Sequence, residues 1–178
     1  LGKFHNWLGL KKTGKSLLPT IKEHSSFIKG SYSKINEYYY KTEDLIPAAE
    51  WYLDNYYLIN GLINELANDL SKQYESKLLH LAGGDFVEFP RIYSIVSEYM
   101  RNSENNFDFQ QLKTFIAEYQ TEAPLSSAEI WAIPIMLKII MLERIFYQVE
   151  RVIYIQKERE FAENWLNSVL GQGYKDIN

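Results

Sequence analysis

The sequence predicts an all-α fold, a bundle of about six helices with two long central helices, the last one kinked by a proline. Apolar residues recur three and four positions apart through most of the chain, which is the period of a helix. Two of these segments begin with a Ser or Asp followed three residues later by Glu or Gln, a helix-capping pattern. No alternating apolar pattern of useful length indicates a strand.

The composition is that of one ordinary globular domain. The 178 residues are 46% hydrophobic and 24% charged, which favours neither disorder nor a repeat array. Cysteine is absent, which excludes disulfides, thiolate zinc sites and cysteine nucleophiles together. The longest run with little charge, residues 130–142, is shorter than the roughly 17–25 residues that span a bilayer. We therefore expect no membrane-spanning segment.

Residues 1–16 are expected to form a linker or arm, because Gly2, Gly9 and Gly14 interrupt a regular helix. Residues 1–41 contain eight lysines and two glutamates, a balance of +6, and the rest of the chain carries −10. Solvated helix faces are the favoured explanation, and a basic arm for an acidic partner or a lipid surface is the alternative. The chain begins with leucine and shows no signal peptide, so we expect a piece of a longer protein.

One helical domain is expected at residues 17–170, followed by a tail at 171–178. Pro47 suits the first turn of a helix, and Gly83 with Gly84 suits the end of one. Asp108 and Gln111 form a capping pair at the start of another. The expected helices span residues 17–40, 47–70, 71–82, 90–100, 108–119 and 126–155.

The segment from Ser126 to Ile155 organises the chain. Ser126 and Glu129 form a capping box, and the apolar residues that follow cover several faces of the first half, so other helices should surround it. Pro134 lacks an amide donor and should bend this helix. The second central helix is expected at residues 47–70.

No catalytic or metal-binding pattern is found. The three histidines, His5, His24 and His80, are far apart and form no metal-ligand motif, so surface or core positions are expected for them. The glycine pairs lack the residues of a phosphate loop or a dinucleotide fingerprint. No cofactor is expected, and the acidic balance beyond residue 41 argues against nucleic acid.

Clusters of aromatic residues are the candidate contact surface. Adjacent helix residues face different ways, so the clusters at 38–40, 51–52 and 56–57 cannot all point into one core. Aromatic rings suit sugar rings and protein interfaces alike, although core packing is the first explanation. The residues assigned to possible glycan or partner contact are Tyr38, Tyr40, Trp51, Tyr52 and Tyr56.

Three stretches of the chain together resemble a known family. They are AAEWYLDNYYLI at residues 48–59, LAGG with FPRIY at residues 81–93, and YQ, PL and EIWAIPIML at residues 119–137. In order and spacing they resemble the amino-terminal region of bacterial cyclic β-1,2-glucan synthases, over roughly residues 45–145. Residues 71–79 depart from the family pattern, since they lack its usual glycine-tyrosine and proline residues.

The resemblance implies a much larger parent protein. Such synthases are inner-membrane proteins with a cytoplasmic UDP-glucose-dependent glycosyltransferase domain, and this region would precede that domain, on the cytoplasmic side of the membrane. The resemblance carries no catalytic role onto these residues. The chain itself is therefore expected not to be an enzyme, and its implied partners are the other domains of the parent synthase.

Three functions follow as hypotheses. The first is a non-catalytic module that organises or docks the transferase machinery at the membrane face, through exposed aromatics, the basic arm and the apolar residues Phe161 and Trp165. The alternative is a carbohydrate-binding module that holds the growing β-1,2-glucan on its Tyr and Trp clusters, which requires two exposed aromatics on one groove. Enzymatic activity of the chain itself ranks last.

Overall fold

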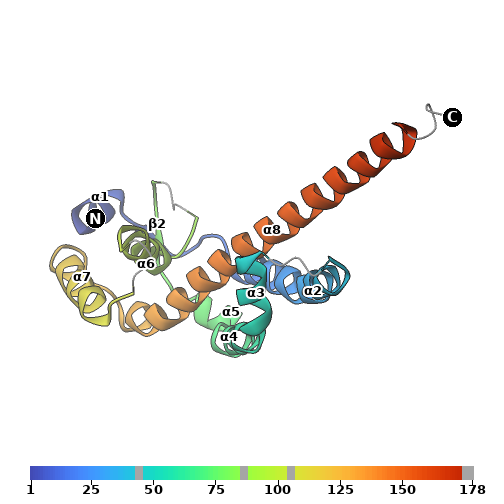
Figure 1. Ribbon diagram of the computed structural model, residues 1–178. Helices are drawn as coiled ribbons and strands as arrows, with labels where there is room; N and C mark the ends of the chain where they lie inside the picture. The colour runs from blue at the N-terminus through green and yellow to red at the C-terminus, as the bar shows by residue number, and fades with distance from the viewer. Residues whose placement is uncertain (43–45, 85–87, 104–106, 174–178) are drawn as a thin grey trace.

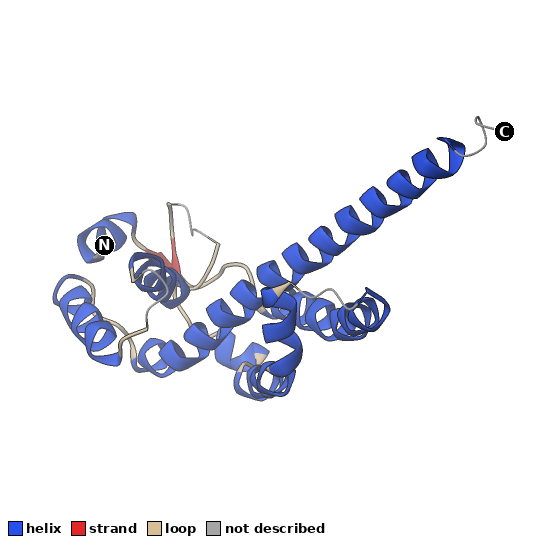
Figure 2. Ribbon diagram, in the orientation of Figure 1, coloured by secondary structure: helices blue, strands red, loops and turns tan. Residues whose placement is uncertain are grey.

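The computed structural model describes residues 1–42, 46–84, 88–103 and 107–173. Helices make up most of this part of the chain, so the predicted all-α class is confirmed (Figure 2). The helices are α1 (Gly2–Leu8), α2 (Leu18–Thr42), α3 (Pro47–Asp54), α4 (Tyr56–Asp69), α5 (Lys72–Glu75), α6 (Arg91–Asn102), α7 (Phe109–Glu122) and α8 (Ser127–Gly173). Strands β1 (Leu10–Lys11) and β2 (His80–Leu81) form one short antiparallel pair.

Helix α8 is the axis of the structure. Its 47 residues run diagonally through the molecule, with α6 and α7 beside its first turns and α2, α3 and α4 around its middle (Figure 1). The second long helix is α2, with 25 residues, and it makes the most extensive packing against α8. The core between them includes Ile28, Ile35 and Met136, none of which is accessible to solvent.

The capping pairs read from the sequence are confirmed. Ser126 donates its backbone N–H to the Glu129 carboxylate (2.9 Å), and the Glu129 N–H reaches the Ser126 hydroxyl (3.3 Å). Asp108 accepts the backbone N–H groups of Gln110 and Gln111 at 2.7 and 2.9 Å. Helix α8 continues through Pro134, and the bend expected there stays a prediction.

The prediction of a single helix at residues 47–70 is wrong. Asn55 separates α3 from α4 with a non-helical backbone conformation, φ −101° and ψ 8°. The Trp51 carbonyl accepts both the backbone N–H of Asn55 (3.0 Å) and its side-chain amide (2.8 Å). The second central helix is consequently α2 instead of this segment.

The prediction of a helix at residues 71–82 is also wrong, since only Lys72–Glu75 is helical in this segment. His80 and Leu81 pair with Lys11 and Leu10 instead, and this distant pairing has no local signal in the sequence. The same pairing ties down the segment expected to be a linker: α1 is helical up to Gly9, whose φ of 76° ends it, and α1 packs on α7. Parts of the connections expected at 41–46, 85–89 and 102–106, and most of the tail at 171–178, lie outside the described residues.

Candidate functional site

The five aromatic residues proposed for contact do not share one surface. Tyr38 and Tyr52 are buried, with 7% and 2% of their surface exposed, whereas Tyr40 and Trp51 are 75% and 55% exposed. Tyr56 is half-buried, with its ring centroid 5.8 Å from that of Tyr52. The structure therefore makes Tyr38 and Tyr52 part of the core and leaves Tyr40 and Trp51 to face solvent.

Tyr52 is buried because its hydroxyl has a partner inside the fold. The hydroxyl donates to the carbonyl of Ile28 at 2.6 Å, which joins α3 to α2. Burial, the largest cause, raises the pKa of Tyr52 well above the usual range. A neutral phenol that bridges two helices serves packing.

Trp51 stands at the edge of a hollow between α3 and α8. The hollow has a volume of about 330 Å³, and its lining combines Ala48, Trp51 and Tyr52 of α3 with Arg144, Ile145, Gln148 and Val149 of α8. The Arg144 guanidinium donates to the Met100 carbonyl at 3.2 Å. Because that head group bonds elsewhere, the lining is mostly apolar and suits an apolar side chain better than a sugar ring.

Helix α8 extends beyond the helices that pack on it. All residues from Glu160 to Leu170 are exposed, and this end projects alone in Figure 1. Phe161, Trp165 and Val169 follow one another at four-residue spacing, with Leu166 and Leu170 beside them. Their exposed fractions run from 45% to 71%. We call these five residues the apolar face of α8.

The opposite side of the same segment is polar. Glu160, Asn164, Asn167 and Ser168 lie there, since three- and four-residue spacing places them on one side of a helix, and Glu163 lies at the border beside Leu170. An isolated helix end of this length is marginal in water, and large exposed apolar side chains add no stability there. An exposed apolar patch of this kind is typical of an interaction site. Sequence reasoning found Phe161 and Trp165 and missed Leu166 and Leu170, although their spacing signals the same face.

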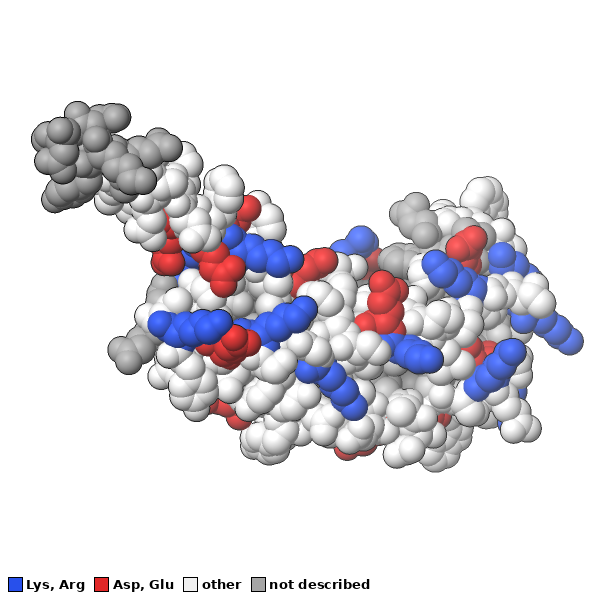
Figure 3. Space-filling model, turned by 90° about the vertical axis from the view of Figure 1, so that its right-hand side faces the viewer, with Lys and Arg blue, Asp and Glu red and all other residues white. Residues whose placement is uncertain are grey.

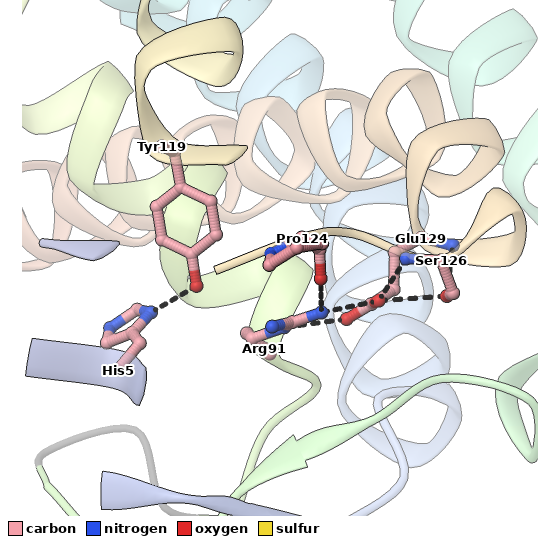
Figure 4. A network of polar contacts seen from close by, with 6 residues as sticks. All are labelled: His5, Arg91, Tyr119, Pro124, Ser126 and Glu129. Carbon is pink, nitrogen blue, oxygen red and sulfur yellow. Dashed lines mark hydrogen bonds and ion pairs between the residues drawn. The ribbon is translucent and has the colours of Figure 1, made fainter. Parts of the chain in front are cut away.

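A buried polar network positions the start of α8 (Figure 4). Arg91 of α6 donates Nε and Nη2 to the two carboxylate oxygens of Glu129 at 2.9 and 2.7 Å, and Nη2 also donates to the Pro124 carbonyl at 3.0 Å. The Arg91 and Glu129 side chains are 3% and 0% exposed. Glu129 also accepts from the hydroxyl of Ser126 at 2.8 Å. One carboxylate thus caps α8 and neutralises the arginine.

This network extends toward the amino terminus. His5 of α1 lies 3.0 Å from the Tyr119 hydroxyl of α7 through its Nδ1. Burial, with smaller contributions from the positive charges of the amino terminus and Arg91, lowers the pKa of His5 to about 4. The imidazole is neutral at pH 7, and its burial against Tyr119 indicates a structural role.

Charges on the surface are mixed in sign. Basic and acidic side chains alternate over the face in Figure 3. Within the described residues, no group of three or more His, Asp or Glu side chains forms a metal site. No helix in that same part of the chain is long and apolar enough to cross a membrane. The hollow beside Trp51 and the apolar face of α8 are therefore the surface features considered for binding.

Comparison with known proteins relates part of the chain to a bacterial synthase. The chain is 27% identical over 110 residues to the cyclic beta-(1,2)-glucan synthase NdvB of Rhizobium meliloti (strain 1021). The match covers 60% of this chain and 4% of that protein, so the chain spans a small part of its relative's length. No family model matches the chain. The chain is a distant, partial relative of this synthase, which confirms the resemblance seen in the sequence.

Proposed function

We propose that this chain is a non-catalytic helical module of a cyclic β-1,2-glucan synthase, in which the apolar face of α8 docks the glycosyltransferase machinery. The observation that carries the proposal is the projection of α8: every residue from Glu160 to Leu170 is exposed, and five of them are large apolar side chains. The relationship to NdvB supports the placement in a synthase. The parent protein, its use of UDP-glucose and a site at the cytoplasmic membrane face belong to the same proposal.

The packing gives the body of the fold and the end of α8 different roles. The body formed by α1 to α7 holds the first half of α8 rigid, with the Arg91–Glu129 pair fixing its start. A rigid base limits the directions in which the helix end can point. A partner that binds the apolar face is thereby held at a defined distance and orientation from the body.

The test is made in cells that produce the whole synthase. Phe161→Ser with Trp165→Ser removes the two aromatic rings from the face without touching the body. We expect loss of most cyclic glucan at unchanged protein abundance, because docking would fail while folding persists. Asn164→Ser with Asn167→Ser, on the polar side of the same turns, is the matched control and should retain synthesis. An unchanged amount of cyclic glucan in the Phe161→Ser, Trp165→Ser variant would refute the docking proposal.

A carbohydrate-binding module remains the second candidate because Trp51 presents an exposed ring beside a hollow that also contains the Gln148 amide. Among the described residues lining this hollow, Trp51 is the one exposed aromatic, since Tyr52 is buried there. Titration with β-1,2-gluco-oligosaccharides, followed by NMR, separates the two functions. Shifts confined to the neighbours of Trp51, abolished by Trp51→Ala, would favour the sugar; unchanged spectra favour docking.

A further inference from the structure

We propose that the partner of the apolar face is a second copy of this chain, and that two α8 helices pair in antiparallel fashion so that each end fills the other's hollow. This inference rests on the docking function proposed above and names its partner. It starts from the positions of two features on one helix.

The hollow and the apolar face lie on the same side of α8. Residues 144, 148, 151, 155, 162, 166 and 169 follow one another at spacings of three, four and seven, which keeps them on one helix face. The half-buried Arg144 and the exposed Gln148 line the hollow, and Leu166 and Val169 belong to the apolar face. A helix laid along this side would therefore contact both features at once.

The sequence distance between the hollow and the apolar face sets the register of such a pair. Residue 157 lies nine residues from Gln148 and nine from Leu166. A twofold axis at the level of residue 157 therefore places Leu166 of one copy opposite Gln148 of the other, and Leu170 opposite Arg144. Gln148 and Arg144 both line the hollow, at about 13 Å and about 20 Å from the axis at 1.5 Å per residue. The volume of about 330 Å³ exceeds that of a single side chain, so Leu166 and Leu170 can enter together.

The charges agree with this register. Arg151 and Glu163, both exposed, are related by the same midpoint, so each pairs with its opposite charge on the other copy. Beyond Arg159 the described helix carries Glu160 and Glu163 and no basic residue. An acidic amphipathic end is repelled by anionic lipid, whose usual ligands are helices rich in Lys and Arg. A helical partner with a basic residue at the matching position fits better, and the chain itself supplies one.

The area is sufficient for a stable contact. The apolar face and Trp51 are each about half exposed or more. With about 150–250 Å² for a whole aromatic side chain, these six residues offer on the order of 600 Å² in each copy. Two copies would then bury about 1,200 Å², the lower end of the range for specific interfaces. We expect a reversible dimer with micromolar affinity.

Sedimentation equilibrium of the complete 178-residue chain tests the pairing, at concentrations from about 1 to about 100 μM, which bracket a micromolar dissociation constant. The expected result is a monomer–dimer equilibrium whose dissociation constant rises at least about tenfold in Trp165→Ser and also in Trp51→Ser, because each removes a large ring from the contact. Asn164→Ser, on the polar side, should leave the constant unchanged. A monomer at every concentration overturns the inference.

Cross-linking tests the register, and the absence of cysteine makes each introduced thiol unique. Glu158→Cys lies beside the proposed axis and should form an intermolecular disulfide on oxidation. Gln148→Cys should form a mixed disulfide with Leu166→Cys when the two variants are combined. Disulfides between two Leu166→Cys chains would show a parallel pair and overturn the antiparallel arrangement.

Two further outcomes separate this inference from the docking function. Flotation with vesicles of uncharged phosphatidylcholine that depends on Trp165 would make lipid the occupant and overturn the pairing. A monomeric chain together with lost glucan synthesis in the Phe161→Ser, Trp165→Ser synthase would also overturn the pairing. That last combination leaves docking intact with a different domain as its partner.

Discussion

The buried pair of Arg91 and Glu129 gives the most quantitative prediction for the fold. Glu129→Gln keeps the shape of the side chain and leaves an amide oxygen to accept from Ser126. It removes the negative charge that faces the Arg91 guanidinium, which is 3% exposed. A buried cation without its partner costs about 3–5 kcal/mol, because desolvation is no longer offset by the ion pair.

The matched control is Glu65→Gln on α4. Glu65 pairs with Lys138 at 2.8 Å, but its side chain is 62% exposed, so water screens the interaction. Surface pairs of this kind contribute about 0–1 kcal/mol. The same chemical change thus removes a charge from a buried pair and from an exposed one.

Urea unfolding followed by far-ultraviolet circular dichroism measures both free energies of unfolding. The account predicts a loss in Glu129→Gln that exceeds the loss in Glu65→Gln by at least about 2 kcal/mol. Arg91→Met with Glu129→Met should recover much of the loss, since it leaves no unpaired charge. Equal effects of the two Glu→Gln changes would refute the assignment of this pair as the anchor of α8.

The remaining predictions concern single side chains. The free energy of unfolding should fall as pH is lowered from about 6.5 to about 4, because His5 binds a proton in the unfolded chain but stays neutral in the fold, where its pKa is about 4. His5→Gln should flatten this slope in a pH series of urea unfolding curves. An unchanged slope would contradict the prediction. Tyr52→Phe should cost about 1 kcal/mol in urea unfolding by leaving the Ile28 carbonyl unpaired, whereas Tyr40→Phe, at an exposed ring, should cost nothing measurable. Gly84→Ala should lower the melting temperature, since φ is +84° and the new Cβ would lie 3.0 Å from the Leu8 side chain. Gly61→Ala, in open space within α4, should raise the melting temperature through about 0.5–1 kcal/mol, and the reverse order would refute the backbone argument.

Local chemistry explains which parts of the fold the sequence predicts. The Ser126–Glu129 and Asp108–Gln111 caps lie within one helical turn of their partners, so spacing alone is enough to find them. The break at Asn55 is a change in the backbone angles of a single residue, and apolar spacing continues across it. The pairing of residues 10–11 with 80–81 joins positions far apart in sequence, and periodicity carries no signal for such contacts.

The candidate surface was predicted only in part for a similar reason. The sequence indicates that Tyr38, Tyr39 and Tyr40 cannot all be buried. The orientation of α2 about its axis decides which of the three is buried. The structure buries Tyr38 and exposes Tyr40. Phe161 and Trp165 were identified from apolar spacing, and their exposure depends on where the other helices stop along α8, which is a property of the tertiary packing.

Hydrogen exchange over residues 160–170 tests the docking claim most directly. In the dilute chain these amides should exchange quickly, because an unpartnered helix end is marginal in water, while the buried turns around Val149 exchange slowly. In the intact synthase the account predicts strong protection of the same residues, since a docked face cannot fray. Equally fast exchange in the dilute chain and in the intact synthase would contradict it.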